Sequence, residues 1–348
     1  MNSVSQIFRQ FLIPITVTGT VLLVFPAGIS GQQTALSIYK AVPDIETDMN
    51  LASELYYPLK CALLGDSLLV LDSRAKKVVI FNAETGEEIG AFGRAGQGPG
   101  EFDTPNDIKV NKETGDIWIL DQNRVIQFDR HGNYLTSISQ FVGSETIALI
   151  PNTGYALSSI ANQQRKSISI FDYDGVLIND FGEAHSFLAT PESQWVFGRS
   201  IIEYAFGKLW QLSQCYNVLR VYDIEGQLIQ EYQLEFETFI DAHERNVRAV
   251  TPPLIAGNLP RKLMYNISSS NDAIWIISLG PFRESRKGGW FLVIRIDPST
   301  GLQNAYSYSL GTLMDIEVLE DADQIRLVGI DAFSQQIVWL KANSSHNE

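Results

Sequence analysis

Cysteine and histidine are scarce in this chain of 348 residues. The two cysteines, Cys61 and Cys215, are too few for a disulfide-stapled fold or a cysteine-ligated zinc site. Four histidines leave little material for histidine-based metal binding or acid–base chemistry. Basic residues are also in deficit, since 26 Lys and Arg stand against 40 Asp and Glu, a formal charge of -14. Because such a charge repels phosphate backbones, nucleic acid is disfavoured as a partner.

Acidic residues are absent from the N-terminal 43 positions, where the pattern is typical of an export signal. Arg9 precedes an apolar run over 11–25, and small residues follow it, so we expect a signal peptide over residues 1–31. An uncleaved membrane anchor is the alternative. A spanning helix needs roughly 20 apolar residues, and this run is interrupted by Pro14 and Gly19. We therefore expect a periplasmic or extracellular protein with no stable membrane span after signal cleavage.

The rest of the chain consists of short strands that recur in a repeat. Runs of β-branched and aromatic residues are separated by turns rich in Gly, Asp and Asn, without a sustained helical period. The clearest unit is a large apolar residue followed by a turn that ends in glycine. Its apolar residue stands at positions 81, 128, 171, 222 and 296, which gives steps of 47, 43, 51 and 74 residues. Two insertions lengthen the last step, and a sixth copy ends at residues 338–341.

Four short strands in a unit of this length are typical of a β-propeller blade. We therefore predict an all-β, six-bladed β-propeller over residues 32–343, followed by a polar tail at 344–348. The sixth copy contains only three strands. We expect residues 35–42 to supply its outer strand by pairing near Val338, which would close the ring where the two ends of the chain meet.

The second repeat carries a family resemblance. Residues 92–102 read Phe-Gly-Arg-Ala-Gly-Gln-Gly-Pro-Gly-Glu-Phe, and this stretch with the positions after it resembles an NHL repeat. Those positions are Pro105, Asp121, Asn123, Phe128, Asp129 and Gly132. The whole chain resembles six-bladed propellers that are common among exported proteins of Bacteroidetes-type bacteria. This resemblance implies the fold and an extracytoplasmic setting, but not one activity, because propellers host binding, scaffolding and catalysis alike.

One face of the predicted ring collects the long connectors, whereas the turns of the opposite face are tight. Because variable loops on a rigid scaffold usually carry function, we take the loop-rich face as the candidate binding surface. The long connectors are 93–105, 182–199, 236–262 and 279–289.

Two of these connectors carry candidate ligand-binding residues. A helix predicted over 238–250 contains His243, and it either packs on the rim or forms a lid over the central channel. The connector in the fifth blade is basic in an otherwise acidic protein. It either is simply solvated or contacts an anionic ligand through Arg283, Arg286 and Lys287.

Further candidates lie where the inner strands begin, because those positions point toward the channel. Asn106 and Asp107 are candidate ligand-binding residues there. Calcium accepts six to eight oxygen ligands, and candidate ligands come from several blades: Asp107, Asn266, Asp315 and Glu317. Propellers of the gluconolactonase and paraoxonase type use such a site, although their ligand motifs do not match this chain residue by residue. The alternative is a polar, water-filled channel or hydrogen bonds between neighbouring inner strands.

The sequence offers no catalytic residues that we can assign, since it contains neither a Gly-x-Ser-x-Gly elbow nor a His–Asp pair with a nucleophile. We therefore predict a non-catalytic binding module whose loop-rich face takes an envelope or extracellular protein, a peptide or a glycan. A calcium-dependent hydrolase or lyase with its site in the channel is the alternative. A purely structural role in an envelope complex is a third possibility.

Overall fold

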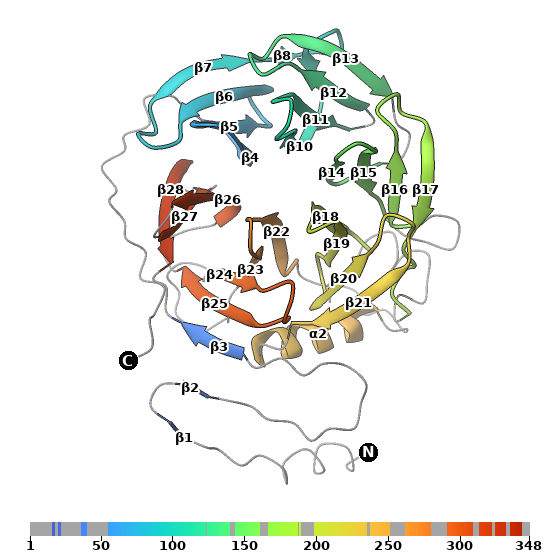
Figure 1. Cartoon of the computed structure of the whole chain (residues 1–348), viewed down its shortest axis with the longest axis vertical. Coiled ribbons are helices and arrows are strands. Elements are labelled where there is room, and N and C mark those ends of the chain that lie inside the picture. The colour runs from blue at the N-terminus through green and yellow to red at the C-terminus, as the bar shows by residue number, and fades with distance from the viewer. Residues whose placement is uncertain are drawn as a thin grey trace.

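The repeated strands form six separate antiparallel sheets around a central axis, and the first strand of each sheet lies nearest that axis (Figure 1). In this computed structural model the described residues are 16–17, 20–21, 36–39, 55–122, 124–139, 143–160, 166–186, 188, 198–234, 237–250, 262–279, 291–308, 313–321, 324–331 and 335–342. The predicted tail at 344–348 and most of the predicted signal segment lie outside them. The prediction of an all-β, six-bladed propeller is confirmed.

Each blade follows the preceding one along the chain. Blade 1 contains β4 (Pro58–Leu64), β5 (Ser67–Asp72), β6 (Lys77–Asn82) and β7 (Glu88–Phe92), and blade 2 contains β10 (Pro105–Val110), β11 (Ile117–Asp121), β12 (Arg124–Phe128) and β13 (Tyr134–Ser139). Blade 3 contains β14 (Ile147–Ile150), β15 (Gly154–Ser158), β16 (Ile168–Phe171) and β17 (Leu177–Phe181), and blade 4 contains β18 (Ser200–Ala205), β19 (Lys208–Ser213), β20 (Val218–Tyr222) and β21 (Leu228–Gln233). Blade 5 contains β22 (Met264–Ser269), β23 (Ile274–Leu279), β24 (Phe291–Ile296) and β25 (Gln303–Tyr308), and blade 6 contains β26 (Leu313–Asp321), β27 (Gln324–Asp331) and β28 (Gln336–Ala342). Short pairs are formed by β1 (Thr16–Val17) with β2 (Thr20–Val21), and by β8 (Arg94–Ala95) with β9 (Glu101–Phe102).

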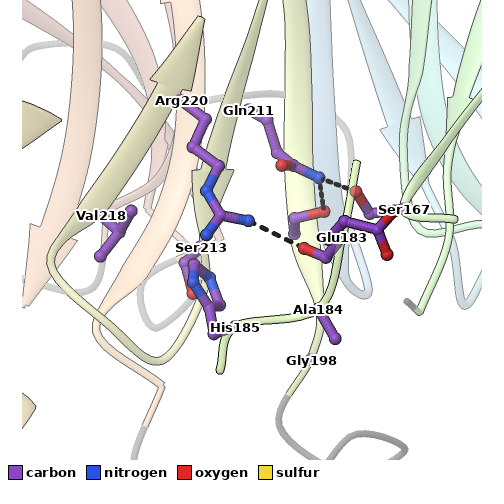
Figure 2. Close-up of a pocket in the computed structure, with 10 residues that line it drawn as sticks. Ser167, Glu183, Ala184, His185, Gly198, Gln211, Ser213, Val218 and Arg220 are labelled. Carbon is purple, nitrogen blue, oxygen red and sulfur yellow. Dashed lines mark hydrogen bonds between the residues drawn. The ribbon is translucent and has the colours of Figure 1, made fainter. Parts of the chain in front are cut away.

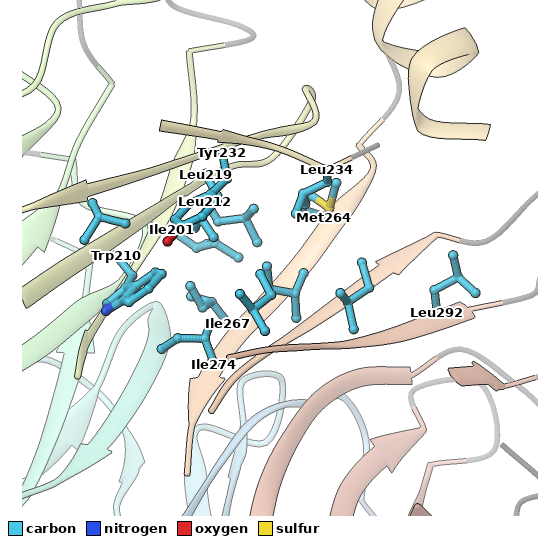
Figure 3. Packing of buried hydrophobic residues seen from close by; sticks show 14 of the residues in the cluster. Ile201, Trp210, Leu212, Leu219, Tyr232, Leu234, Met264, Ile267, Ile274 and Leu292 are labelled. Atoms are coloured by element: carbon cyan, nitrogen blue, oxygen red, sulfur yellow. The ribbon is translucent and has the colours of Figure 1, made fainter. Parts of the chain in front are cut away.

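The apolar core lies between the blades. Every residue of β11 is buried, whereas β13 is largely exposed at the outer edge. Figure 3 shows the contact between blades 4 and 5, where Trp210 and Leu212 face Ile267 and Ile274. Since each blade buries its apolar faces only against its two neighbours, the ring is stabilised by the packing of all six.

The recurring turn that ends in glycine forms a contact between blades. In blade 2, Asp129 Oδ1 accepts hydrogen bonds from the backbone N–H groups of His131 and Asn133. Gly132 has a φ of 80°, and a Cβ added to it would lie 2.7 Å from the ring of Phe92 in blade 1. A glycine at this position therefore allows both the backbone conformation of the turn and the close approach of the preceding blade.

The predicted closure of the ring by an N-terminal strand is wrong. Residues 35–42 were expected to pair near Val338, but β3 (Leu36–Tyr39) lies parallel to β25 and adds a fifth strand to blade 5. Within the described residues, the sheet of blade 6 has three strands. The apolar alternation of a segment predicts a strand, but it does not determine which of several exposed sheet edges the strand joins.

Side chains fasten blade 6 to blade 1 instead. Arg326 forms a bidentate ion pair with Glu84, at 2.8 and 3.0 Å, and Trp339 Nε1 donates to the carbonyl of Ala83 at 2.8 Å. An apolar cluster lies beneath these contacts, with Leu68, Val70, Val79 and Phe81 of blade 1 packed against Val328, Ile330 and Ile337 of blade 6.

The connector after blade 4 contains the predicted helix, α2 (Glu237–Val250), which in the view of Figure 1 lies toward the outside of the ring, between the labels of β3 and β21, rather than over its centre. Asn246 Nδ2 donates to the carbonyl of Cys215 at 2.6 Å, and Val250 packs against Tyr216. The structure thus favours the rim position over the lid. No helix in the described part of the chain combines the length and apolarity needed to cross a membrane.

Candidate functional site

Equivalent positions of the six inner strands surround the central channel. A bulge near the start of the inner strand recurs in blades 1, 2, 5 and 6. The six equivalent residues are Lys60, Asp107, Thr146, Ile201, Asn266 and Asp315. Five of these six residues are polar, and Ile201 of blade 4 is the exception.

Three of these side chains connect one blade to the next. Asp107 Oδ2 accepts from the N–H of Ile147 at 2.9 Å, and Asp315 Oδ2 accepts from the N–H of Cys61 at 2.7 Å. Thr146 makes the same kind of contact with blade 4, where its Oγ1 accepts from the N–H of Ile202 at 3.0 Å.

Two lysines neutralise the carboxylates of the channel. Lys60 Nζ donates to Asn266 Oδ1 at 2.6 Å and lies 3.7 Å from Asp315 Oδ1. Lys109 Nζ reaches across the ring to Glu203 Oε2, also at 2.6 Å. Burial acts to lower the pKa of Lys109, but its acidic neighbours outweigh burial and raise it.

Glu317 lies on the same inner surface. Burial raises its pKa to about 8, with Asp315 acting in the same direction and Lys109 acting against it. Burial likewise raises the pKa of Asp107 and of Asp315, and the lysines oppose that effect.

Three of the four predicted calcium ligands, Asp107, Asn266 and Asp315, are hydrogen-bonded to other groups of the protein. Asp107 uses both carboxylate oxygens on backbone N–H groups, and the Lys60 ammonium lies where a cation would meet Asn266 and Asp315. Among the described residues, no three His, Cys, Asp or Glu side chains lie close enough to share a metal ion. The alternative prediction of hydrogen bonds between neighbouring inner strands describes this channel.

Two of the remaining predicted ligand-binding residues, Asn106 and His243, lie on separate elements of the described structure. Asn106 is half-buried on β10, and His243 is half-buried on α2, with its ring 5.7 Å from that of Tyr216. Burial lowers the pKa of His243. Arg283, Arg286 and Lys287 lie outside the described residues and stay predictions.

A pocket does lie on the loop-rich face, between blades 3 and 4 (Figure 2). It contains about 300 Å³ of empty space that is partly open to solvent, and its enclosed part holds about one water-sized group. Its lining residues are Ser167, Glu183, Ala184, His185, Gly198, Ser200, Gln211, Ser213, Val218 and Arg220.

Gln211 and Arg220 organise the polar groups of the pocket. Gln211 Nε2 donates to Ser167 Oγ at 2.7 Å and to Ser200 Oγ at 3.0 Å (Figure 2). Arg220 Nη1 donates to the carbonyl of Glu183 at 2.8 Å. Burial, assisted by the charge of Arg220, lowers the pKa of the neighbouring His185 to about 3, so this imidazole is neutral at neutral pH.

Comparison of the blades shows that Gln211 is exceptional. It is 5% exposed, at a position of the second strand whose side chain packs toward the preceding blade. The equivalent residues in the other blades are Val70, Ile119, Leu157, Ile276 and Gly329. Blade 4 thus places an amide where the repeat otherwise carries apolar residues or glycine.

Ser213, two residues further on, is exceptional in another way. At the equivalent position of every other blade, a side-chain oxygen makes a hydrogen bond to another group of the protein. Those residues are Asp72, Asp121, Ser159, Ser278 and Asp331. Ser213 Oγ is buried, and no group of the described chain is hydrogen-bonded to it.

Blade 4 carries smaller residues than blade 2 at this point. In blade 2 the corresponding space holds Arg124, whose Nη2 lies 2.8 Å from Asp121 Oδ2 and whose Nη1 donates to the carbonyl of Gln97. Blade 4 has Val218 and Ser213 at these two positions. This site was not predicted from the sequence, although Gln211 interrupts an otherwise apolar run in β19 and was the available signal.

Comparisons with known proteins agree with this architecture. The family DUF5128, described as a 6-bladed beta-propeller, matches residues 52–242, and the chain belongs to this family. No curated protein matches the sequence.

Solved structures with the same fold include two from Bacteroides. One is a Bacteroides fragilis protein described as exported, with 12% identity, a TM-score of 0.56, and coverage of 84% of this chain and 88% of that one. Another is a DUF4221 family member from Bacteroides vulgatus, with 9% identity, a TM-score of 0.53, and coverage of 84% and 94%. A streptogramin B lyase matches with 16% identity, a TM-score of 0.51, and coverage of 85% and 86%. At these identities the similarity shows the fold alone.

Proposed function

We propose that this protein is an exported, non-catalytic binding module that takes a peptide, protein or glycan at its loop-rich face. The pocket between blades 3 and 4 is the contact point. One observation carries this proposal: an amide, Gln211, is buried at a repeat position that is apolar or glycine in the five other blades. Blade 4 gives up the apolar contact of the repeat at this position and builds a hydrogen-bonded amide with two serines instead, a departure from the repeat that indicates a role beyond packing.

The chemistry of the pocket supports binding over catalysis. Activating a serine as a nucleophile requires a neighbouring general base. The imidazole that lines this pocket, His185, has a pKa of about 3 and is therefore a weak base. The channel also gives little support to the calcium-dependent alternative, because Lys60 occupies the space between Asn266 and Asp315.

The predicted signal peptide supports export, and the fold shared with a Bacteroides fragilis protein described as exported is consistent with it. Fractionation of cells that express the full chain tests this part of the proposal. We expect the protein in the periplasm or the medium with an N-terminus beyond residue 31, and recovery from the cytoplasm with residue 1 intact would contradict export.

Arrays of oligosaccharides and of peptides test the binding function. We expect the wild-type protein to retain a defined set of ligands, and Gln211→Val to lose them. Gln127→Val is the matched control, because Gln127 on β12 is hydrogen-bonded to Asp116 and lies away from the pocket. If Gln211→Val keeps every ligand that the wild type binds, the pocket is not the contact.

A further inference from the structure

The hydroxyl groups of the pocket are arranged to donate hydrogen bonds. Gln211 Nε2 has two protons, and it gives one to Ser167 Oγ and the other to Ser200 Oγ. Each serine oxygen therefore acts as an acceptor toward Gln211 and retains its own proton for another group. Ser213 adds a third hydroxyl that is 3% exposed and has no partner within the described residues.

Arg220 adds a positive charge beside these hydroxyls. Its Nε donates to Glu231 Oε2 at 2.7 Å and its Nη1 to the carbonyl of Glu183, so guanidinium protons remain for a further acceptor. The Glu183 carboxylate is turned away, since its side chain is 75% exposed and pairs with Lys166. The fixed groups that face the pocket are therefore mainly donors, and they include the Arg220 guanidinium, whose charge is shared with Glu231.

From these contacts we infer that the pocket binds a carboxylate of the ligand. A carboxylate brings acceptor oxygens and one negative charge, which complement the serine hydroxyls and the Arg220 guanidinium. The enclosed part admits about one water-sized group, such as one carboxylate oxygen, so the remainder of the ligand lies on the loop-rich face. The inference rests on the proposed binding function and adds the chemistry of the ligand to it.

A carboxylate on a polar ligand can belong to an acidic sugar or to the C-terminus of a peptide. Ligand-observed NMR titration of the purified protein distinguishes them with glucuronate and N-acetylglycine as probes. Glucose and N-acetylglycinamide are the uncharged counterparts. We expect one of the two acids to bind about tenfold more tightly than its counterpart, which corresponds to one charge-assisted contact.

Variants at one repeat position test whether Ser213 makes the contact. We expect Ser213→Ala to weaken binding of the acid about tenfold or somewhat less, because one hydrogen bond is lost. Ser278→Ala is the matched control, since Ser278 holds the equivalent position in blade 5 and donates to the carbonyl of Leu279. It should bind like the wild type. Unchanged melting temperatures show that both variants are folded.

A second variant fills the pocket with the residues of blade 2. Ser213→Asp combined with Val218→Arg recreates the Asp121–Arg124 pair, and we expect it to abolish binding of the acid. Equal binding of acid and uncharged counterpart, or an equal effect of Ser213→Ala and Ser278→Ala, would overturn the inference.

Failure of both acids to bind would also overturn the carboxylate assignment. If the arrays still yield a ligand that Gln211→Val loses, the proposed function survives that result. If the arrays yield none, the proposed function fails with it.

Discussion

Lys60 in blade 1 and Asn266 in blade 5 are separated by 206 positions in the sequence, yet Lys60 Nζ donates to Asn266 Oδ1 over 2.6 Å. The same ammonium lies 3.7 Å from Asp315 in blade 6. One side chain thus connects three blades across the centre of the ring, at the place where the sequence suggested a calcium ion.

Removing that ammonium should destabilise the whole ring. Lys60→Met leaves the buried Asp315 carboxylate without its countercharge, and we expect the free energy of unfolding to fall by about 3 kcal/mol. Asp315→Asn in the same chain should recover part of the loss, because it removes the uncompensated charge. Urea unfolding of the two single variants and the double variant measures this coupling.

An exposed ion pair provides the control. Arg94 is 79% exposed and pairs with Glu101, so Arg94→Ala should cost about 0–1 kcal/mol. If Lys60→Met costs no more than Arg94→Ala, the lysine does not fasten the ring.

Glu317 should make stability depend on pH. Burial raises its folded-state pKa from 4.5 to about 8, so between these values the folded protein holds a proton that the unfolded chain has released. Stability attributable to Glu317 therefore falls as the pH rises from 4.5 to about 8, and it is constant above that range. The charged groups around it are Lys109, Asp315, Glu203 and Lys112.

Glu317→Gln removes this dependence. We expect the variant to be more stable than the wild type at the upper end of the range and similar to it at the lower end. Unfolding free energies measured across the range test this, and parallel pH profiles for the two proteins would contradict the burial of an ionisable Glu317.

His185 should titrate far below the usual range. Burial, together with Arg220 and His243, lowers its folded-state pKa from 6.5 to about 3. Between these values the unfolded chain binds a proton that the folded protein does not, so the contribution of His185 to stability falls as the pH falls from 6.5 to about 3. NMR titration of the imidazole measures the pKa directly, and a midpoint near 6.5 would show that the ring is solvated.

Replacing Gly132 by alanine should cost more stability than the same replacement at a glycine that has open space around it. Gly132 and Gly65 both have positive φ, which alone costs an alanine about 1–2 kcal/mol. Only at Gly132 would the new Cβ lie 2.7 Å from Phe92, whereas nothing lies within 4 Å at Gly65. We expect thermal unfolding to show a larger loss for Gly132→Ala, and Phe92→Ala to offset part of it. Equal losses at the two glycines would argue against the inter-blade contact.

Gln211→Val should leave stability almost unchanged while binding is lost. The variant loses two hydrogen bonds of about 1 kcal/mol each, but it gains the apolar contacts that Val70 makes at the same repeat position. The reverse change, Ile119→Gln in blade 2, should destabilise by about 1–3 kcal/mol, because the amide would be buried in an apolar cluster. Chemical denaturation of both variants measures the difference, and a similar loss in each would make Gln211 an ordinary core residue.

Much of the fold could be predicted because its signals are local and recur. The apolar residues at 81, 128, 171 and 222 each lie at a bulge between the third and fourth strands, as the repeat implied. The sixth blade was harder to align with the other repeats from the sequence. There the pairing places Leu327 opposite Leu340, as Ile117 lies opposite Phe128 in blade 2. Its strands carry few of the turn residues that set the alignment elsewhere.

The sequence by itself determined the number of blades, the order of their strands and the face that collects the long connectors, because each depends on residues within one repeat. Tertiary structure decided which blade received β3, which carboxylates met Lys60 and Lys109, and where a pocket remained open. Those outcomes depend on side chains from different blades that meet only when the ring is formed. Such contacts have no fixed spacing along the chain, so no repeat period reveals them.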